Sequence, residues 1–253
     1  MVEEIFAIRE KPEEVILRRF RLLGLVLLGL GAGIIIHNIL LRFIINGLRS
    51  NNPALINNWS SYLMLFSIFG LFHGIMSWAT GATISHVLAV LRVRHKILET
   101  SSLMLIIWGL LLIIDYLIQI TQPVTLQEFS QLINKPPSVI ELVLYVLPIT
   151  GYLLMGIGFA DIAKRLGMLR TLRIGSYIII CGGLLFILDF GWIILSIGLL
   201  IASLTFFCLK LEIITRVLIS AEYRKKLKKL NNFDAKMFSQ RMRKNKDFDK
   251  PLF

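Results

Sequence analysis

Two histidines, His37 and His73, are the residues whose type and placement most directly suggest cofactor chemistry. Each lies within a long apolar block, about 22 Å and about 25 Å from the same end of its block at 1.5 Å per residue. Adjacent antiparallel helices would bring the two imidazoles to one depth, as a bis-histidine b-type haem requires, and Gly33, Gly70 and Gly74 would leave room. The alternative is that both histidines are packing residues, each hydrogen-bonded to a neighbouring side chain or carbonyl group.

Four further ionisable residues lie in or beside apolar blocks, where burying charge is costly. Asp115 and Asp189 each close an apolar stretch, Arg42 could be the counter-ion of Asp115, and Glu141 could join them. One interpretation is a cation or proton site that opens to the outside. The other, which we favour, is a set of interfacial carboxylates solvated among lipid headgroups, with the Arg42 side chain extending to the surface.

Motifs for hydrolysis, phosphate binding and metal binding are missing from the sequence. It has no nucleophile elbow, no HExxH, and no Cys/His cluster with metal-ligand spacing, and its glycines lie inside apolar blocks rather than in loops. We therefore expect neither an enzyme nor a metal site, and a haem is the only cofactor that the residues suggest.

The elements that must position these residues are six apolar blocks. The chain has 253 residues, of which 56% are hydrophobic. All blocks except the fifth can supply the roughly 20 residues that cross a bilayer as a helix. This composition predicts an all-α membrane bundle with about six transmembrane helices. The blocks are residues 22–46, 62–91, 102–120, 139–163, 172–188 and 191–211.

The basic residues are distributed unequally between the two ends of these blocks. Alternate threading places the segments 1–21, 92–101, 164–171 and 212–253 on one face, and 25 of the 28 Lys and Arg residues lie in or beside them. Only Arg42, Arg49 and Lys135 lie towards the other face. Because positive charge near short loops marks the cytoplasmic side, we expect a multi-pass cell-membrane protein with both termini in the cytoplasm.

Three regions follow from this threading. Residues 1–21 are expected to form a cytoplasmic amphipathic helix, residues 22–211 the transmembrane domain, and residues 212–253 a basic cytoplasmic helix and tail. The tail can bind anionic lipid headgroups, but its excess of charge is also compatible with an acidic protein, a nucleic acid or the ribosome. Its densest basic cluster comprises Arg224, Lys225, Lys226, Lys228 and Lys229.

Two smaller patterns add structural expectations. The stretches from Gly109 to Asp115 and from Gly183 to Asp189 are similar, which suggests that the second and third spans are repeated in parallel as the fourth and fifth. In addition, the loop 121–138 is expected to contain a short amphipathic helix at about residues 126–133.

The function that these features favour is that of a non-catalytic membrane component of a multi-subunit transport or translocation assembly. Such a component would contact a cytoplasmic partner, or a polyanion, through its basic face. A self-contained transporter or channel with a site near Asp115, Asp189 and Arg42 is the first alternative. An electron-transfer subunit with haem between His37 and His73 is the second.

Overall fold

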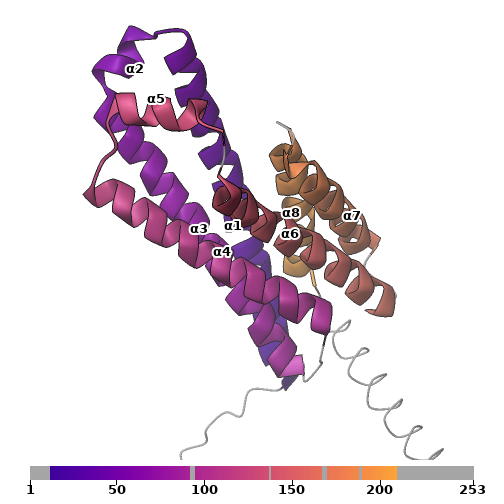
Figure 1. Cartoon of the computed structure of the whole chain (residues 1–253). Coiled ribbons are helices and arrows are strands. Elements are labelled where there is room, and N and C mark those ends of the chain that lie inside the picture. The colour runs from indigo at the N-terminus through magenta and orange to yellow at the C-terminus, as the bar shows by residue number, and fades with distance from the viewer. Residues whose placement is uncertain (1–11, 92–94, 137, 167–169, 188–189, 210–253) are drawn as a thin grey trace, which may run out of the picture. The chain divides into compact units, whose positions relative to one another are not determined.

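The computed structural model describes residues 12–91, 95–136, 138–166, 170–187 and 190–209, and all regular secondary structure in these ranges is helical (Figure 1). The chain divides into two units, Met1–Leu209 and Lys210–Phe253, and the second lies outside the described residues. The predicted all-α class is confirmed, whereas the expected basic helix and tail at 212–253 lie outside the described part of the chain.

The described ranges contain six long helices: α1 (Pro12–Arg49), α3 (Trp59–Leu91), α4 (Lys96–Thr121), α6 (Val139–Leu166), α7 (Arg170–Leu184) and α8 (Gly191–Phe207). The short helices α2 (Pro53–Asn57) and α5 (Leu126–Asn134) and the 3₁₀ turn η1 (Leu185–Ile187) complete it. Helix α1 is continuous from Pro12, so the expected boundary between residues 21 and 22 is not a break in the helix.

Four of these helices are long and apolar enough to cross a membrane, namely α1, α3, α4 and α6. Helix α8 is apolar but has 17 residues, and α7 has 15, of which Arg170 and Arg173 are charged. The chain is therefore a multi-span helical membrane protein by length and composition, and the count of six spans stays a prediction.

Each long helix packs against the next one along the chain, and α8 returns to pack against α1. Neighbouring helices run antiparallel, because Gly29 and Gly33 of α1 meet Met76 and His73 of α3 in reverse order, and glycines at the other interfaces show the same reversal. Helices α1, α4 and α7 therefore begin at one end of the bundle, where α3, α6 and α8 finish.

Helix α8 packs against α1 through specific contacts, which close the ring of neighbouring helices. The Ser203 hydroxyl donates a hydrogen bond to the Gly24 carbonyl at 2.6 Å. Two rings, Phe20 and Phe206, stack with their centroids 5.6 Å apart. Close backbone approach at glycine and a hydroxyl-to-carbonyl bond are both typical of helix pairs in membranes, where burial of apolar surface gives little drive for association.

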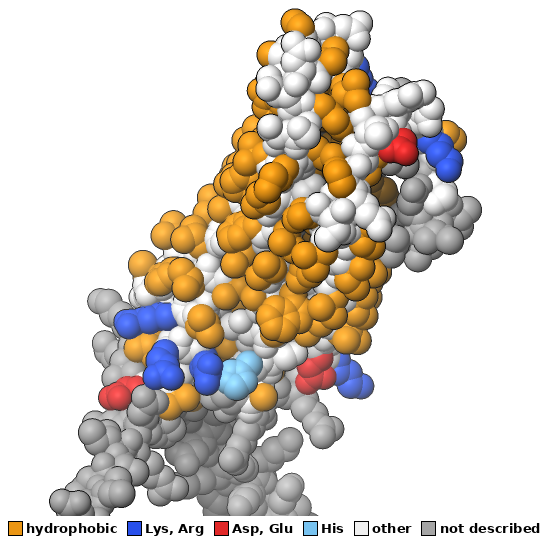
Figure 2. Space-filling view, turned by 90° about the vertical axis from the view of Figure 1, so that its left-hand side faces the viewer, with side chains coloured by type: hydrophobic (Ala, Val, Ile, Leu, Met, Phe, Trp, Pro, Cys, Tyr) orange, Lys and Arg blue, Asp and Glu red, His pale blue; other side chains and the backbone are white. Residues whose placement is uncertain are grey.

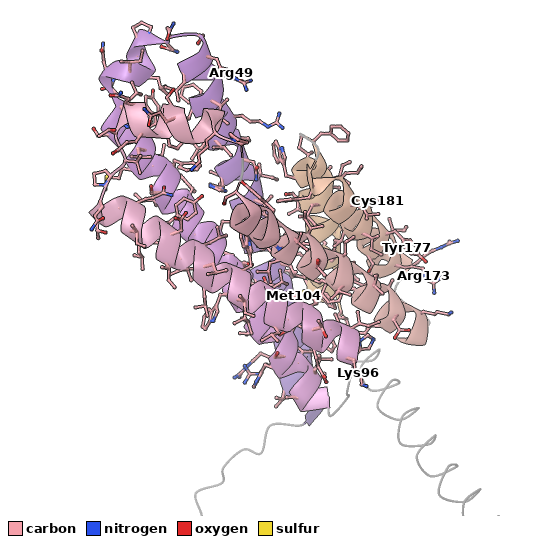
Figure 3. All side chains as sticks on the ribbon, viewed as in Figure 1. Arg49, Lys96, Met104, Arg173, Tyr177 and Cys181 are labelled. Atoms are coloured by element: carbon pink, nitrogen blue, oxygen red, sulfur yellow. The ribbon has the colours of Figure 1, made fainter. Side chains whose placement is uncertain are left out.

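The end at which α1, α4 and α7 begin is named the basic end. The basic residues there whose side chains are described are Arg18, Arg19, Arg21, Lys96, Lys164, Arg170 and Arg173. Arg49 and Lys135 lie at the opposite end, and Figure 3 shows Arg49 and Lys96 far apart along the helices. Between the two ends, the face in Figure 2 is covered mainly by hydrophobic side chains, as a lipid-facing surface should be.

Helix α5 confirms the amphipathic helix expected in the loop 121–138. It begins with a capping box, in which Glu128 accepts hydrogen bonds from the backbone N–H and the hydroxyl of Thr125. The ring of Phe129 packs on Trp59, whose indole N–H donates to the Val124 carbonyl at 3.1 Å. These contacts hold α5 against the start of α3, at the end opposite the basic end (Figure 1).

The glycines of the suggested repeat of the second and third spans pack in two ways. Gly109 of α4 and Gly183 of α7, which begin the similar stretches, each pack on the preceding helix, against Trp78 of α3 and Leu153 of α6. Gly74 and Gly81 of α3 pack on the following helix, α4. A looser match in the sequence, at a shift of 77 residues, pairs these two with Gly151 and Gly158 of α6, which pack on the preceding helix, again α4, rather than on α7. The duplication therefore stays a prediction from the sequence.

Candidate functional site

The two histidines of the sequence analysis lie together inside the bundle. His37 of α1 and His73 of α3 have ring centroids 5.6 Å apart, with ring planes inclined at 51°. The expectation that antiparallel neighbours bring them to one depth is confirmed. Gly33 makes this possible, because its missing side chain lets α1 approach the backbone of His73.

Aromatic rings occupy the space around His37. Its Nε2 lies 2.6 Å from the Tyr116 hydroxyl of α4, and the Phe66 ring stacks on the imidazole at a centroid distance of 4.8 Å. Tyr116 reaches this position because Gly70 of α3 has no side chain, and a Cβ at residue 70 would overlap the phenol ring. A haem bound between the histidines would have to displace both aromatic rings, because His37 Nε2 already has a partner.

His73 differs from His37 in having no hydrogen bond. Its side chain is buried, and neither ring nitrogen meets a partner among the described residues. One helical turn nearer the basic end, the Ser77 hydroxyl donates to the Leu105 carbonyl at 3.3 Å. Tyr152 of α6 is buried at the same level, since the neighbouring Gly151 packs on Leu105, and its hydroxyl has no hydrogen-bond partner among the described residues. The centre of the bundle thus contains several neutral polar groups whose bonding capacity is unused.

Asp115 and Arg42, which the sequence suggested as a pair, each have described contacts of their own, and the carboxylate site near them stays a prediction. Asp115 is exposed and accepts a hydrogen bond from the Gln119 amide at 3.1 Å, and Gln119 in turn accepts one from Ser67. The Arg42 guanidinium lies 5.5 Å from the centroid of the Trp192 ring of α8, in a cation–π contact. Arg42 and Asp115 therefore have partners on different helices.

Other predicted residues fall outside the described part of the structure. Asp189 is one of them, and although Glu141 belongs to the first turn of α6, its side chain is not described. The basic cluster of the tail, Arg224, Lys225, Lys226, Lys228 and Lys229, lies outside the described residues as well. Within the described ranges, no group of three or more His, Cys, Asp or Glu side chains is placed to hold a metal ion.

A polar contact near the basic end was not anticipated from the sequence. His95 caps the N-terminus of α4, where its Nδ1 accepts from the Leu98 N–H at 3.4 Å. Its Nε2 therefore carries the proton and donates to Asp161 of α6 at 2.9 Å. The sequence analysis did not single out His95, and the pairing of α4 with α6 is what brings Asp161 to it.

Comparisons of this chain with protein-family models, with curated proteins and with solved structures gave no match.

Proposed function

We propose that this chain is a non-catalytic component of a membrane transport or translocation assembly and contacts a partner through its basic end. The observation that supports this is the separation of charge along the described helices. Seven described basic side chains belong to the basic end, against Arg42, Arg49 and Lys135 towards the other. In this proposal the basic end is cytoplasmic, six helices cross the cell membrane, and both termini lie inside.

The basic end carries more positive charge than is needed to orient the protein in the membrane. A few Lys or Arg residues near short loops fix the orientation of a helical protein, so the remaining ones are available for an acidic protein, a polyanion or anionic lipid. Within the described residues, the loops between the long helices contain only α2 and α5 as further helices, which leaves little room there for a separate catalytic domain.

Co-purification from the native membrane tests this proposal. Replacing Lys96, Lys164, Arg170 and Arg173 with Gln should remove stoichiometric polypeptides that accompany the wild-type protein. The matched control replaces Arg49 and Lys135 with Gln and should retain them. The same polypeptides with both variants, or none with the wild-type protein, would overturn the proposal. Removal of residues 224–253 extends the test to the tail.

A self-contained transporter is the second candidate, and the chain of hydrogen bonds from Ser67 through Gln119 to Asp115 favours it. This chain links an exposed carboxylate to a hydroxyl buried between α3 and α4. If Asp115 binds a transported cation, Asp115→Asn should abolish flux in proteoliposomes at unchanged expression. Unaltered flux in that variant would exclude this site.

A further inference from the structure

The two ring nitrogens of His73 are buried in the described part of the bundle without a hydrogen bond, which is unusual for polar atoms. The residue is 4% exposed and lies near the middle of α3. A neutral imidazole has one N–H donor and one acceptor nitrogen, and neither is used here by any described residue. Buried polar groups in proteins are almost always hydrogen-bonded, and lipid chains offer no substitute partner.

The hydroxyl of Tyr152 is a second buried polar group that no described residue binds. Tyr152 is fully buried on α6, and its hydroxyl also lacks a partner among the described residues. Tyr152 and Ser77 lie at one level of the bundle, because Ser77 binds the Leu105 carbonyl and Gly151, next to Tyr152, packs on the Leu105 side chain. Ser77 also shares a helix face with His73, because the two are four residues apart. Ser77 uses its proton on Leu105, so its oxygen retains a free acceptor position.

We infer that His73, Ser77 and Tyr152 form a binding site for one small, uncharged, hydrogen-bonding molecule, either water or a polar solute of similar size. His73 supplies a donor and an acceptor, Tyr152 a further donor, and Ser77 a further acceptor. The inference is independent of the transport role.

Two observations restrict the ligand to this class. The three groups are uncharged, and the titratable side chains in contact with His73 or with its neighbour His37 are His37 itself and the Tyr116 phenol. A charged ligand would be buried without compensation. Apolar residues of the neighbouring helices, including Ile34, Leu105 and Met155, are fully buried. Packed protein interiors have few voids larger than a water molecule, so the ligand must be small.

The sign of the stability change on removing the polar atoms tests the inference. If the site is occupied, Tyr152→Phe and His73→Phe each lose hydrogen bonds, and the apparent Tm of the purified protein should fall by about 2–4 °C for each bond lost. Because both residues hold the same molecule, the double variant should lose less than the sum of the two. His73→Gln, which keeps a donor and an acceptor, should retain more stability than His73→Phe.

Matched controls come from exposed residues of the same types. His86→Phe on α3 and Tyr177→Phe on α7 change surface side chains, and Tyr177 points away from the bundle (Figure 3). Both should leave the Tm unchanged. An unchanged or higher Tm for Tyr152→Phe, which keeps the ring and should fold, would overturn the inference, because removing an unpaired polar atom from a dry core is neutral or stabilising.

Native mass spectrometry then separates the two sources of the ligand. A retained solute adds its own mass to the wild-type protein and is absent from His73→Phe. A lowered Tm in the variants without an added mass in the wild-type protein assigns water.

Discussion

Gly70→Ala should be among the most destabilising small substitutions in the bundle, because the added methyl group overlaps the ring of Tyr116. Tyr116 is 5% exposed and cannot move outwards without breaking its 2.6 Å contact with His37. Overpacking costs about 1–3 kcal/mol. Leaving the His37 nitrogen unpaired costs about 1–3 kcal/mol more. Alanine recovers about 0.5–1 kcal/mol within a helix.

The net expectation is a loss of about 3 kcal/mol, or roughly 6–12 °C in apparent Tm for a chain of this size. Gly31→Ala is the matched control, since a Cβ there would meet Leu199 and Ser196 at 3.5 Å, an ordinary van der Waals contact. It should be neutral or slightly stabilising. The assay is thermal unfolding of the purified protein in detergent, followed by loss of the monodisperse peak.

A double substitution shows whether the overlap is the cause. Gly70→Ala should destabilise the Tyr116→Ala variant far less than the wild-type protein, because the methyl group then occupies vacated space. If Gly70→Ala unfolds at the wild-type temperature, or if the two substitutions are additive, the packing of Tyr116 against Gly70 does not support His37.

Three further outcomes are expected. Asp161→Ala should lower the free energy of unfolding by about 1–2 kcal/mol because it leaves the buried His95 without its acceptor, and in the background of His95→Ala the effect should largely vanish. Hydrogen bonds from the Thr125 backbone N–H and, to a smaller extent, from its hydroxyl lower the pKa of Glu128. The ionised Glu128 therefore stabilises α5 fully above the ordinary carboxyl pKa, and this stabilisation is lost as the pH falls through the lowered pKa. Hydrogen exchange in α5, corrected for intrinsic rates, should show this loss, and an unchanged profile in Thr125→Ala would contradict it. The protein purified with haem available should show no Soret band, because Tyr116 already occupies His37 Nε2; a band lost in His37→Phe would refute this.

The elements were predictable because apolar length and turn residues determine them locally. The six blocks correspond to the six long helices, and the capping box of Thr125 and Glu128 is a sequence signature of a helix start. The meeting of His37 with His73 was also predictable, because depth in a membrane helix follows from residue number. The side of the helix on which a residue faces a given neighbour does not follow from residue number in the same way, because it depends on how each helix is rotated about its axis.

The partners of the site residues depend on that rotation and on which helices are neighbours. Arg42 was expected beside Asp115, but α1 packs on α3 and α8, and its guanidinium lies over Trp192. Tyr116 follows directly on the stretch that suggested a repeat and was given no role there, although it is the partner of His37. Only the position of Gly70 on α3, opposite Tyr116, could have indicated this pairing with His37. Finding it requires knowing which residues of α3 face which residues of α4.

The contact of α8 with α1 has a consequence for how the protein is made. The hydrogen bond from Ser203 to Gly24 joins residues 179 positions apart, and at roughly 5–20 residues per second the nascent chain needs roughly 10–35 s to supply the donor. Throughout that interval α1 has α3 on one side and no protein from its own chain on the other. Lipid or the insertion machinery must cover that side until the last helix arrives. A polypeptide that terminates early, before α8, would present the Gly24 carbonyl and Phe20 as an open edge that quality-control proteases can recognise.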